Sequence, residues 1–382
     1  MSQDPRASRQ ADDASRLIEG AIERRVFPSA VAEAGSSARV IWRAPFGRLT
    51  FDQDAANTTE TTIFDLASLT KAMATATLAI DLMRSGRLRL DERIATAFAE
   101  WRGWDRESTT VRDFLEHASG LPARLVDRPP QTRREFEHEI CTIRLEYTLR
   151  TQSIYSDLDF ILLAFLLEQR AGRALDAQFD DLWRPLAGEA DSEDWIGFHV
   201  APADRPRTAP TKPLEEDARV GRVLVGEVHD AYAAALGGVA GHAGLFGTAP
   251  AVGRFARAML RGARGDASMR GPFSPDAVAL AVKKTSVPRS SRALGWDTML
   301  PTSSCGTTLS PAAFGHVGFT GTSLWIDPTL DRYFVLLTNR AYSEKGREVF
   351  PTSSMEKPPD PFLDHMRTVR RSFHDILSSI DG

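Results

Sequence analysis

The chain has 382 residues, of which 42% are hydrophobic and 26% are charged, and its formal net charge is -4. This composition is ordinary for a globular protein, and the length allows one large core or two lobes. The charge is nearly balanced and has no long run of one sign, which argues against nucleic acid or an anionic membrane as a partner.

The N-terminal stretch MSQDPRASRQADDASRL is polar and lacks the apolar segment of a secretory signal. No apolar run approaches the roughly 18 residues that a membrane span needs. We therefore expect a soluble, cytoplasmic protein without a membrane span, or a periplasmic one if a leader peptide has been removed. Two cysteines, Cys141 and Cys305, are too few for a disulfide framework or a zinc cage.

The first predicted elements are a helix and two strands. Residues 13–26 carry apolar side chains at helical spacing, which predicts a surface helix. The segments AVAEAG (30–35) and RVIWRA (39–44) are typical of short strands joined by a turn. A helix is then predicted over 68–85. It is apolar on nearly every face, as a buried central helix is, and Gly86 is placed to end it.

The middle of the chain, from 87 to about 190, has a mostly helical pattern. Its three clearest segments are TTVRDFLEHASGLP (109–122), DLDFILLAFLLEQRAG (157–172) and ALDAQFDDLWRPL (174–186). Residues 199–230 are rich in proline, arginine and turn formers, which indicates an ordered loop region. Two more helices are predicted after it, in AVGRFARAMLRG (251–262) and SPDAVALAVKK (274–284).

After about residue 293 the apolar period changes toward two, which is typical of strands. The four strand candidates are ALGWDTML (293–300), FGHVGF (314–319), GTSLWIDP (321–328) and RYFVLLTNR (332–340), and a closing helix follows over 362–380. This order predicts an α/β (α+β) fold, in which an antiparallel sheet built from both chain ends is flanked by helices. We assign 1–70 and 245–382 to this lobe and 71–244 to a large inserted helical lobe, with a cleft between them for a small molecule.

Ser68 and Lys71 stand three residues apart at the head of the predicted helix, so their side chains face the same way. The positive end of the helix dipole favours negative charge on the serine oxygen, and a buried lysine can lose its proton and act as a base. The pattern alone is weak, because Ser354 and Lys357 repeat it in a polar, proline-bounded stretch. The long buried helix favours Ser68 as a nucleophile activated by Lys71.

Two further segments carry side chains suited to the same chemistry. Tyr155 and Asp157 stand at a predicted loop-to-helix junction. A tyrosine beside a cationic lysine can act as a general base, while Asp157 can also serve as the helix N-cap. His316 and Gly318 lie on a predicted strand, where Gly318 would let a substrate lie close to the backbone. An edge strand of this kind can supply a backbone N–H to an oxyanion.

The order Ser-x-x-Lys, then a tyrosine motif, then His-x-Gly resembles the three-motif pattern of the serine β-lactamase and penicillin-binding-protein superfamily. The segments DLASLTK, FLEHASGLP, YSDLDFILL, GHAGLFGTA and HVGFTGTSLWIDP resemble its class C and esterase-like branch. This similarity runs from about residue 20 to 345. It implies a β-lactamase/transpeptidase-like fold and a serine hydrolase that works through an acyl-enzyme without a cofactor or metal.

The resemblance also implies roles for individual residues. Ser68 matches the acylated nucleophile, Lys71 its partner in proton transfer, and Tyr155 the base. The matching substrate-binding positions are Asp157, His316, Val317, Gly318 and Phe319. The backbone N–H groups of Ser68 and Phe319 would form the oxyanion hole. Whether Lys71 or Tyr155 is the base stays open at this point.

The chain departs from the family pattern at three of these positions. Asp157 stands where the family has an amide residue, and it could accept a hydrogen bond from Lys71 and keep that amine charged. His316 and Val317 stand where a Lys-Thr pair would hold a substrate carboxylate, and a neutral histidine would hold it weakly. We therefore expect an ester or a non-terminal amide, such as one in a muropeptide, rather than penicillin as the substrate.

Other motifs point away from competing functions. The glycines of GGVAGHAGLFG (237–247) do not fit a dinucleotide or phosphate loop, and we expect them to allow close packing. His242 within this loop is a minor candidate for a residue near the site. The chain has no H-E-x-x-H, C-x-x-C or G-x-S-x-G sequence, which disfavours a metal hydrolase or an α/β-hydrolase. The alternatives are a true β-lactamase or D-alanyl-D-alanine carboxypeptidase, and a catalytically silent ligand-binding module. The oligomeric state stays open.

Overall fold

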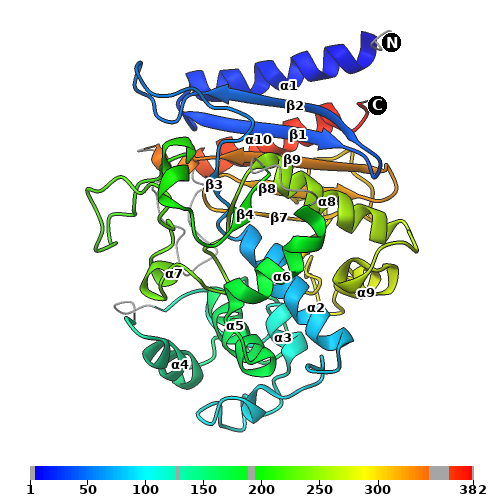
Figure 1. Cartoon of the computed structure of the whole chain (residues 1–382). Coiled ribbons are helices and arrows are strands. Elements are labelled where there is room, and N and C mark those ends of the chain that lie inside the picture. Colours follow the sequence, from blue (N-terminus) through cyan, green and yellow to red (C-terminus); the bar gives the residue numbers. More distant parts are fainter. Residues whose placement is uncertain (1–4, 126–129, 188–193, 344–360, 381–382) are drawn as a thin grey trace.

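The computed structural model of the chain describes residues 5–125, 130–187, 194–343 and 361–380. The second Ser-x-x-Lys sequence, at residues 354 to 357, lies outside these ranges. Figure 1 shows an antiparallel sheet with helices on both faces, and the helices from the middle of the chain gather at one end of the molecule. The two termini lie close to each other at the opposite end.

Within the described residues, the main sheet has six antiparallel strands. In spatial order they are β2 (Val40–Gly47), β1 (Ser29–Gly35), β9 (Arg332–Thr338), β8 (Ser323–Asp327), β7 (Phe314–Val317) and β6 (Asp297–Thr298). The N-terminal hairpin thus joins the C-terminal strands through the pairing of β1 with β9, as the sequence predicts. All six predicted strands are present, although the first C-terminal candidate is reduced to the two residues of β6.

The period of two along β9 decides which helices cover each face of the sheet. Tyr333, Val335 and Leu337 pack into the large core on one face, whereas Phe334 and Leu336 pack into a second core on the other. The covering helices are α8 (Ala249–Ala263) on the first face, and α1 (Pro5–Glu23) with α10 (Pro361–Leu377) on the second. In Figure 1, α1 and α10 lie together on the side that carries both chain ends.

The remaining elements come mostly from the middle of the chain. The helices are η1 (Lys71–Ala76), α2 (Thr77–Arg84), η2 (Ile94–Thr96), α3 (Val111–Leu115), α4 (Arg133–Thr142), α5 (Asp157–Ala171), α6 (Leu175–Ala187), η3 (Pro202–Arg207), α7 (Ala231–Ala235), η4 (Gly271–Phe273), α9 (Pro275–Ala281) and η5 (Arg340–Tyr342). A small sheet has the order β3 (Phe64–Asp65), β5 (Phe246–Gly247) and β4 (Ile196–Gly197).

The large core is continuous between the sheet and the helices. One hydrophobic cluster contains Val335 of β9, Met73 of η1 and Leu163 of α5. The two predicted lobes, 1–70 with 245–382 and the inserted 71–244, would share this core. The division into two lobes stays a prediction. No helix in the described ranges is long and apolar enough to cross a membrane. Both cysteines are buried and free.

Three local predictions differ from the structure. The predicted helix over 68–85 is a π-helix in its first part, η1, and becomes α-helical only in α2. Residues 87–110 are mainly turns, with η2 as the single helical piece described there. The charged segment of α4 was not predicted as a separate helix, because it buries only Phe136, Ile140 and Cys141. Gly86 does end α2, with a φ of 71°.

Candidate active site

Ser68 stands on a tight turn between β3 and η1. The Asp65 carboxylate accepts hydrogen bonds from the backbone N–H groups of Ala67, at 2.8 Å, and His229, at 2.7 Å. Ala67 has a φ of 47°, a left-handed conformation that residues with a Cβ rarely adopt. From residue 62 to 80, Ser68 alone is not buried. The turn therefore holds one hydroxyl at the surface on an otherwise fixed backbone.

Lys71 lies one turn after Ser68, and its side chain is fully buried. Its Nζ donates to Ser68 Oγ at 3.1 Å, to Asp157 Oδ1 at 2.7 Å and to the His242 carbonyl at 3.0 Å. Burial by itself lowers the pKa of Lys71, but the negative charge of Asp157 and the neighbouring Tyr155 raise it above its usual value. Lys71 is therefore a cation that holds the serine oxygen, rather than a neutral amine.

Tyr155 lies close to two cations. Its ring centroid is 4.7 Å from Lys71 Nζ and 5.0 Å from the guanidinium carbon of Arg292. The rings of His117 and His316 are also adjacent, with centroids 4.8 Å and 5.9 Å from that of Tyr155. The predicted base thus stands beside the predicted nucleophile pair.

Asp157 joins Lys71 to a second ion pair that the sequence does not reveal. Arg124 Nη1 donates to Asp157 Oδ2 at 2.9 Å and to Asp230 Oδ2 at 3.1 Å, and the His242 ring bonds Asp230 Oδ1 at 2.7 Å. Burial raises the pKa of Asp157, but Lys71 and Arg124 outweigh it and hold the pKa below its usual value. Arg124 and Asp230 occur in no recognisable motif, so only the fold brings them together.

The N-cap of α5 is Ser156, so the interpretation of Asp157 as the cap is wrong. The Ser156 hydroxyl accepts from the Leu158 N–H at 3.2 Å, while the Asp157 carboxylate turns toward the cations. The Ser156 N–H donates to His117 Nδ1 at 3.1 Å. Asp159, one turn further, is buried beside His117, and burial raises its pKa well above the usual value. His117 thus packs against the Tyr155 ring, and Asp159 lies beside His117.

His316 presents a hydrogen-bond acceptor rather than a charge. Its Nδ1 bonds the Val317 carbonyl at 2.9 Å, so Nδ1 carries the proton and Nε2 carries the lone pair. The pKa of His316 is well below its usual value, because burial and then the Arg292 cation oppose protonation. Nε2 is buried and has no partner within the described residues. The expected weak hold on a carboxylate at this position therefore has a structural basis.

Gly318 is required by the packing of the protein itself. A Cβ at this position would lie 2.1 Å from Thr322 Oγ1 and 2.7 Å from the Leu66 carbonyl. The segment after β7 is thereby held against the turn that carries Ser68, and Phe319 follows directly. The first half of β7 is not at the sheet edge, because Phe314 and Gly315 pair with β6. The short strand β6 does not reach His316, so the second half of β7 is at the edge. The prediction of an edge strand thus holds only for the C-terminal half of β7.

The glycine-rich loop before β5 supports the same site through close packing, as expected. A Cβ on Gly241 would lie 2.1 Å from the Phe160 carbonyl of α5. The Gly241 carbonyl accepts from Thr75 Oγ1 of η1 at 2.7 Å. This contact fixes His242, whose carbonyl receives the Lys71 hydrogen bond. His242 therefore belongs to the site through its backbone and through its bond to Asp230.

A metal ion fits this cluster poorly. The ligand atoms of Asp157, Asp230 and His242 lie within 4.8 Å of one another, which is close enough for a shared cation. Both carboxylates, however, already bind Lys71 or Arg124, and a bound metal would compete with these two cations. The donor set is thus that of an ion-pair network.

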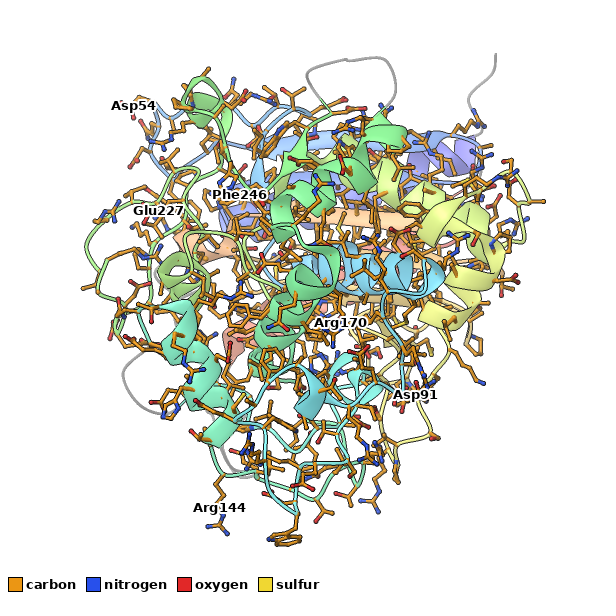
Figure 2. The ribbon with its side chains drawn as sticks, turned by 60° about the horizontal axis from the view of Figure 1, so that its bottom comes forward. Asp54, Asp91, Arg144, Arg170, Glu227 and Phe246 are labelled. Carbon is orange, nitrogen blue, oxygen red and sulfur yellow. The ribbon has the colours of Figure 1, made fainter. Side chains whose placement is uncertain are left out.

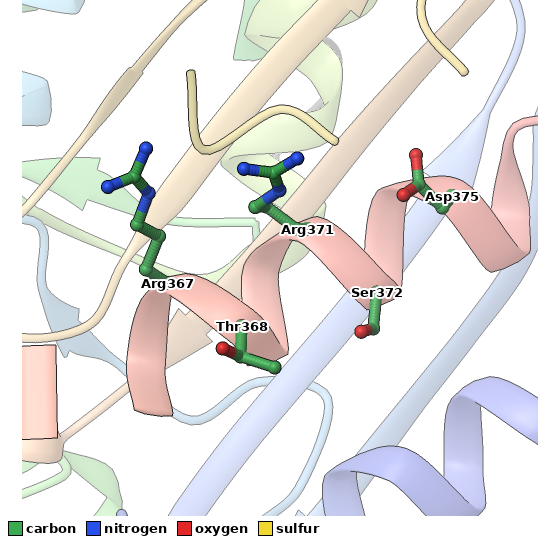
Figure 3. A pocket seen from close by; sticks show the side chains of 5 residues that line it. All are labelled: Arg367, Thr368, Arg371, Ser372 and Asp375. Atoms are coloured by element: carbon green, nitrogen blue, oxygen red, sulfur yellow. The ribbon is translucent and has the colours of Figure 1, made fainter. Parts of the chain in front are cut away.

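Two surface hollows, each of about 440 Å³, lie elsewhere on the molecule. One is lined by α10 residues, among which Figure 3 shows Arg367 and Arg371 projecting to the same side of the helix. The other lies between α2 and α6 and includes Asp81 and Phe273. Neither contains a residue of the Ser68 cluster, so the chemistry of the side chains, not the size of a hollow, identifies the candidate site.

Known proteins are similar to this chain over most of its length. A family model described as Beta-lactamase matches residues 14–352. A protein of Escherichia coli K12 named "Putative D-alanyl-D-alanine carboxypeptidase" is 30% identical over 83% of this chain and 76% of its own length. An N-acetylmuramyl-L-alanine amidase of Bacillus subtilis 168 is 27% identical over 91% of this chain and 84% of its own length.

A solved structure of similar fold is EstCE1, a hydrolase with promiscuous acyltransferase activity. It has a TM-score of 0.72 and 18% sequence identity, and the match covers 96% of this chain and 99% of EstCE1. At this identity the similarity shows the fold alone. It agrees with the sheet built from both chain ends and the helices around it.

Proposed function

The chain belongs to the Beta-lactamase family, and on that premise we propose that it is a serine hydrolase whose nucleophile is Ser68. One observation carries this proposal: the Lys71 ammonium bridges Ser68 Oγ and Asp157 Oδ1 beneath the Tyr155 ring. A buried cation that contacts a half-exposed hydroxyl stabilises the negative charge that the oxygen develops during attack.

We assign the base to Tyr155, because Asp157 keeps Lys71 protonated. Tyr155 takes the proton of Ser68 as Oγ forms a bond to the substrate carbonyl carbon. When the tetrahedral intermediate collapses, its bond to the leaving oxygen or nitrogen breaks, and Tyr155 returns the proton to that atom. Water then attacks the acyl-enzyme by the same proton route in reverse and releases the acid product and free Ser68.

We assign the oxyanion hole to the backbone N–H groups of Ser68 and Phe319. The Ser68 N–H donates to no acceptor within the described residues. The close approach of Gly318 to Leu66 supports a location of the Phe319 backbone beside the same turn. Two such donors would stabilise the intermediate without reorganising during the reaction.

The substrate we propose is an ester or a non-terminal amide, such as one in a muropeptide. His316 offers a lone pair where a Lys-Thr pair would hold the carboxylate of a β-lactam. The names of the relatives, a carboxypeptidase and a muramyl-alanine amidase, support a cell-wall peptide as the physiological class. A cytoplasmic location, which is also a proposal, would suit turnover of imported fragments better than wall synthesis.

Hydrolysis of 4-nitrophenyl esters, nitrocefin and muropeptides by the wild type and Ser68→Ala tests this proposal. We expect turnover of the ester and of a muropeptide amide, and its loss in the variant. Tyr155→Phe should lower kcat by roughly 10² to 10⁴, since it removes the proton acceptor. Nitrocefin turnover far above ester turnover would contradict the substrate assignment, and activity that survives Ser68→Ala would contradict the nucleophile.

A further inference from the structure

Arg292 brings a cation into the site that no carboxylate of the described chain neutralises. Its backbone is fixed, because its N–H donates to Ser290 Oγ at 3.0 Å and its carbonyl accepts from the Thr285 N–H at 2.8 Å. Its guanidinium carbon lies 5.0 Å from the Tyr155 ring centroid, and the side chain is partly exposed. Within the described residues the guanidinium makes no hydrogen bond or ion pair, although it can donate five.

The charges around Tyr155 do not balance. Lys71 and Arg124 are matched by the two ionised carboxylates to which they are bonded, Asp157 and Asp230. The other acidic group nearby, Asp159, is fully buried, and burial raises its pKa well above the usual value, which favours its neutral form. Arg292, which is partly exposed and lies 5.0 Å from the ring centroid, is left as the excess positive charge and attracts an anion.

The neighbouring histidines do not share this charge. Burial and the Arg292 cation together hold the pKa values of His117 and His316 well below their usual range, so both rings are neutral. His316 Nε2 is also buried and carries a lone pair, which repels a carboxylate and would accept from an N–H or O–H group instead. An acidic group on the substrate therefore has Arg292 as its available partner.

We propose that Arg292 binds a carboxylate on the ester or amide that Ser68 attacks. The inference rests on the proposed function and names its substrate class. Lys71 and Arg292 both lie against the Tyr155 ring, at 4.7 Å and 5.0 Å from its centroid, so the acid binds next to the reacting carbonyl. The planar guanidinium fork can hold a carboxylate through two parallel hydrogen bonds.

Matched ester pairs test this assignment on both sides of the scissile bond. On the acyl side, 4-nitrophenyl butyrate is compared with the mono-4-nitrophenyl ester of succinate. On the leaving-group side, phenyl acetate is compared with 3-acetoxybenzoate. The measured quantity is the ratio of kcat/KM for the acidic ester to that for its neutral partner, in the wild type, Arg292→Gln and Arg292→Lys. A ratio separates recognition of the acid from any general effect on Tyr155.

We expect the ratio for at least one pair to fall about tenfold or more in Arg292→Gln, the usual loss for a hydrogen bond to a charged group. Arg292→Lys should restore part of it. Added salt should lower the wild-type ratio, because the attraction is electrostatic. The matched control is Arg144→Gln, which removes an exposed arginine at the rim of the helical part (Figure 2) and should keep the wild-type ratio.

Two results would overturn the assignment of Arg292. One is an unchanged ratio for both pairs, and the other is an equal loss of acidic and neutral turnover, which would show that Arg292 acts only on Tyr155. Wild-type protein that hydrolyses none of the four esters would instead contradict the proposed function itself. The two failures are therefore distinguishable in one set of assays.

Discussion

At the scale of single residues, the site depends on how one buried ammonium is shared. Lys71 has three N–H bonds, and their acceptors are Ser68, Asp157 and the His242 carbonyl. Asp157 favours the charged form of Lys71, and we propose that this leaves Tyr155 as the proton acceptor. Under that proposal, an aspartate in place of the family's amide changes which side chain works as the base.

Asp157→Asn tests the ion pair beneath the nucleophile. The change removes the carboxylate that pairs with the fully buried Lys71, so we expect the free energy of unfolding to fall by about 3 kcal/mol or more. The pKa of Lys71 should fall as well, because burial then acts with less opposition. The matched control is Asp54→Asn at an exposed position (Figure 2), where we expect a change within about 0.5 kcal/mol. Equal urea-unfolding curves for the two variants would refute the assigned role of Asp157.

Asp65 predicts a pH dependence of stability. Burial raises its pKa from 3.8 to about 6. As pH rises through the interval between these values, the unfolded chain loses this proton before the folded chain does, so the folded state loses stability. We expect this group to lower the free energy of unfolding by roughly 1 to 3 kcal/mol between pH 4 and pH 7.

Urea unfolding of the wild type and of Asp65→Asn at several pH values tests this prediction. The measured quantity is how the free energy of unfolding of each protein changes with pH. The variant cannot ionise at this position, so the difference in unfolding free energy between the two proteins should change across the interval. A constant difference, which would reflect only the lost hydrogen bond to the turn, would contradict the raised pKa.

At the scale of elements, the site is assembled where three backbone segments touch. The turn after β3 carries Ser68, the π-helix η1 carries Lys71, and the segment after β7 lies against that turn through Gly318. Directly after η1, Thr77 Oγ1 at the start of α2 donates to the carbonyl of Ala72, five residues before it. Isolated π-turns of this kind often occur at functional sites, where the altered spacing redirects side chains.

Gly318→Ala should disturb the contact between β7 and the nucleophile turn. The added Cβ would lie 2.1 Å from Thr322 Oγ1, so one backbone must move. We expect a loss of about 1 to 3 kcal/mol in unfolding free energy. We also expect kcat to fall by roughly tenfold or more, because the movement displaces Ser68.

The control for this substitution is Gly20→Ala in α1, where the nearest atom is the flexible end of Arg24 at 3.2 Å. Alanine there should leave stability unchanged or raise it slightly, since alanine favours helix. If Gly318→Ala behaves like this control in thermal unfolding and ester hydrolysis, the glycine is not the point that holds the site together.

The sequence predicts the elements better than it predicts their contacts. The alternation in RYFVLLTNR and the apolar run after Asp157 depend on local spacing, and both elements form as predicted. Ser68, Lys71 and Tyr155 are found because their motifs resemble those of a known family. Arg124, Asp230 and Arg292 belong to no motif and meet the site only through tertiary packing. The π-helix is missed because no side-chain pattern distinguishes it from an α-helix.

At the scale of the whole molecule, a helical layer formed by both chain ends covers one face of the sheet, and the core beneath the site lies on the other. α1 and α10 cover the sheet face opposite to α8, in a core separate from the one that contains η1 and α5. The reacting groups and this terminal layer thus lie on different faces of one sheet. One residue of α10 crosses this separation, because Arg370 Nη2 donates to the Gly318 carbonyl at 2.8 Å and to the Thr322 carbonyl at 2.9 Å. A substitution elsewhere in the terminal layer can therefore change stability without removing a contact to the site.

Phe373→Ala tests that separation. Phe373 is fully buried in the terminal layer, and truncation should cost about 3 to 5 kcal/mol of unfolding free energy. The protein that remains folded should keep the wild-type kcat at low temperature. Thr368→Ala, at an exposed position on the same helix (Figure 3), should stay within about 0.5 kcal/mol of the wild type. Equal stabilities for the two variants would show that α10 is not needed for the fold.

The central claim is that Ser68 is a nucleophile activated in place by Lys71 and Tyr155. The most direct measurement is intact-protein and peptide mass spectrometry after reaction with a fluorophosphonate probe. The account predicts one adduct on Ser68, none in Ser68→Ala, and slower labelling in Tyr155→Phe. No adduct at any pH between about 6 and about 9, or an adduct on another residue, would contradict it and favour a binding module that keeps the fold without turnover.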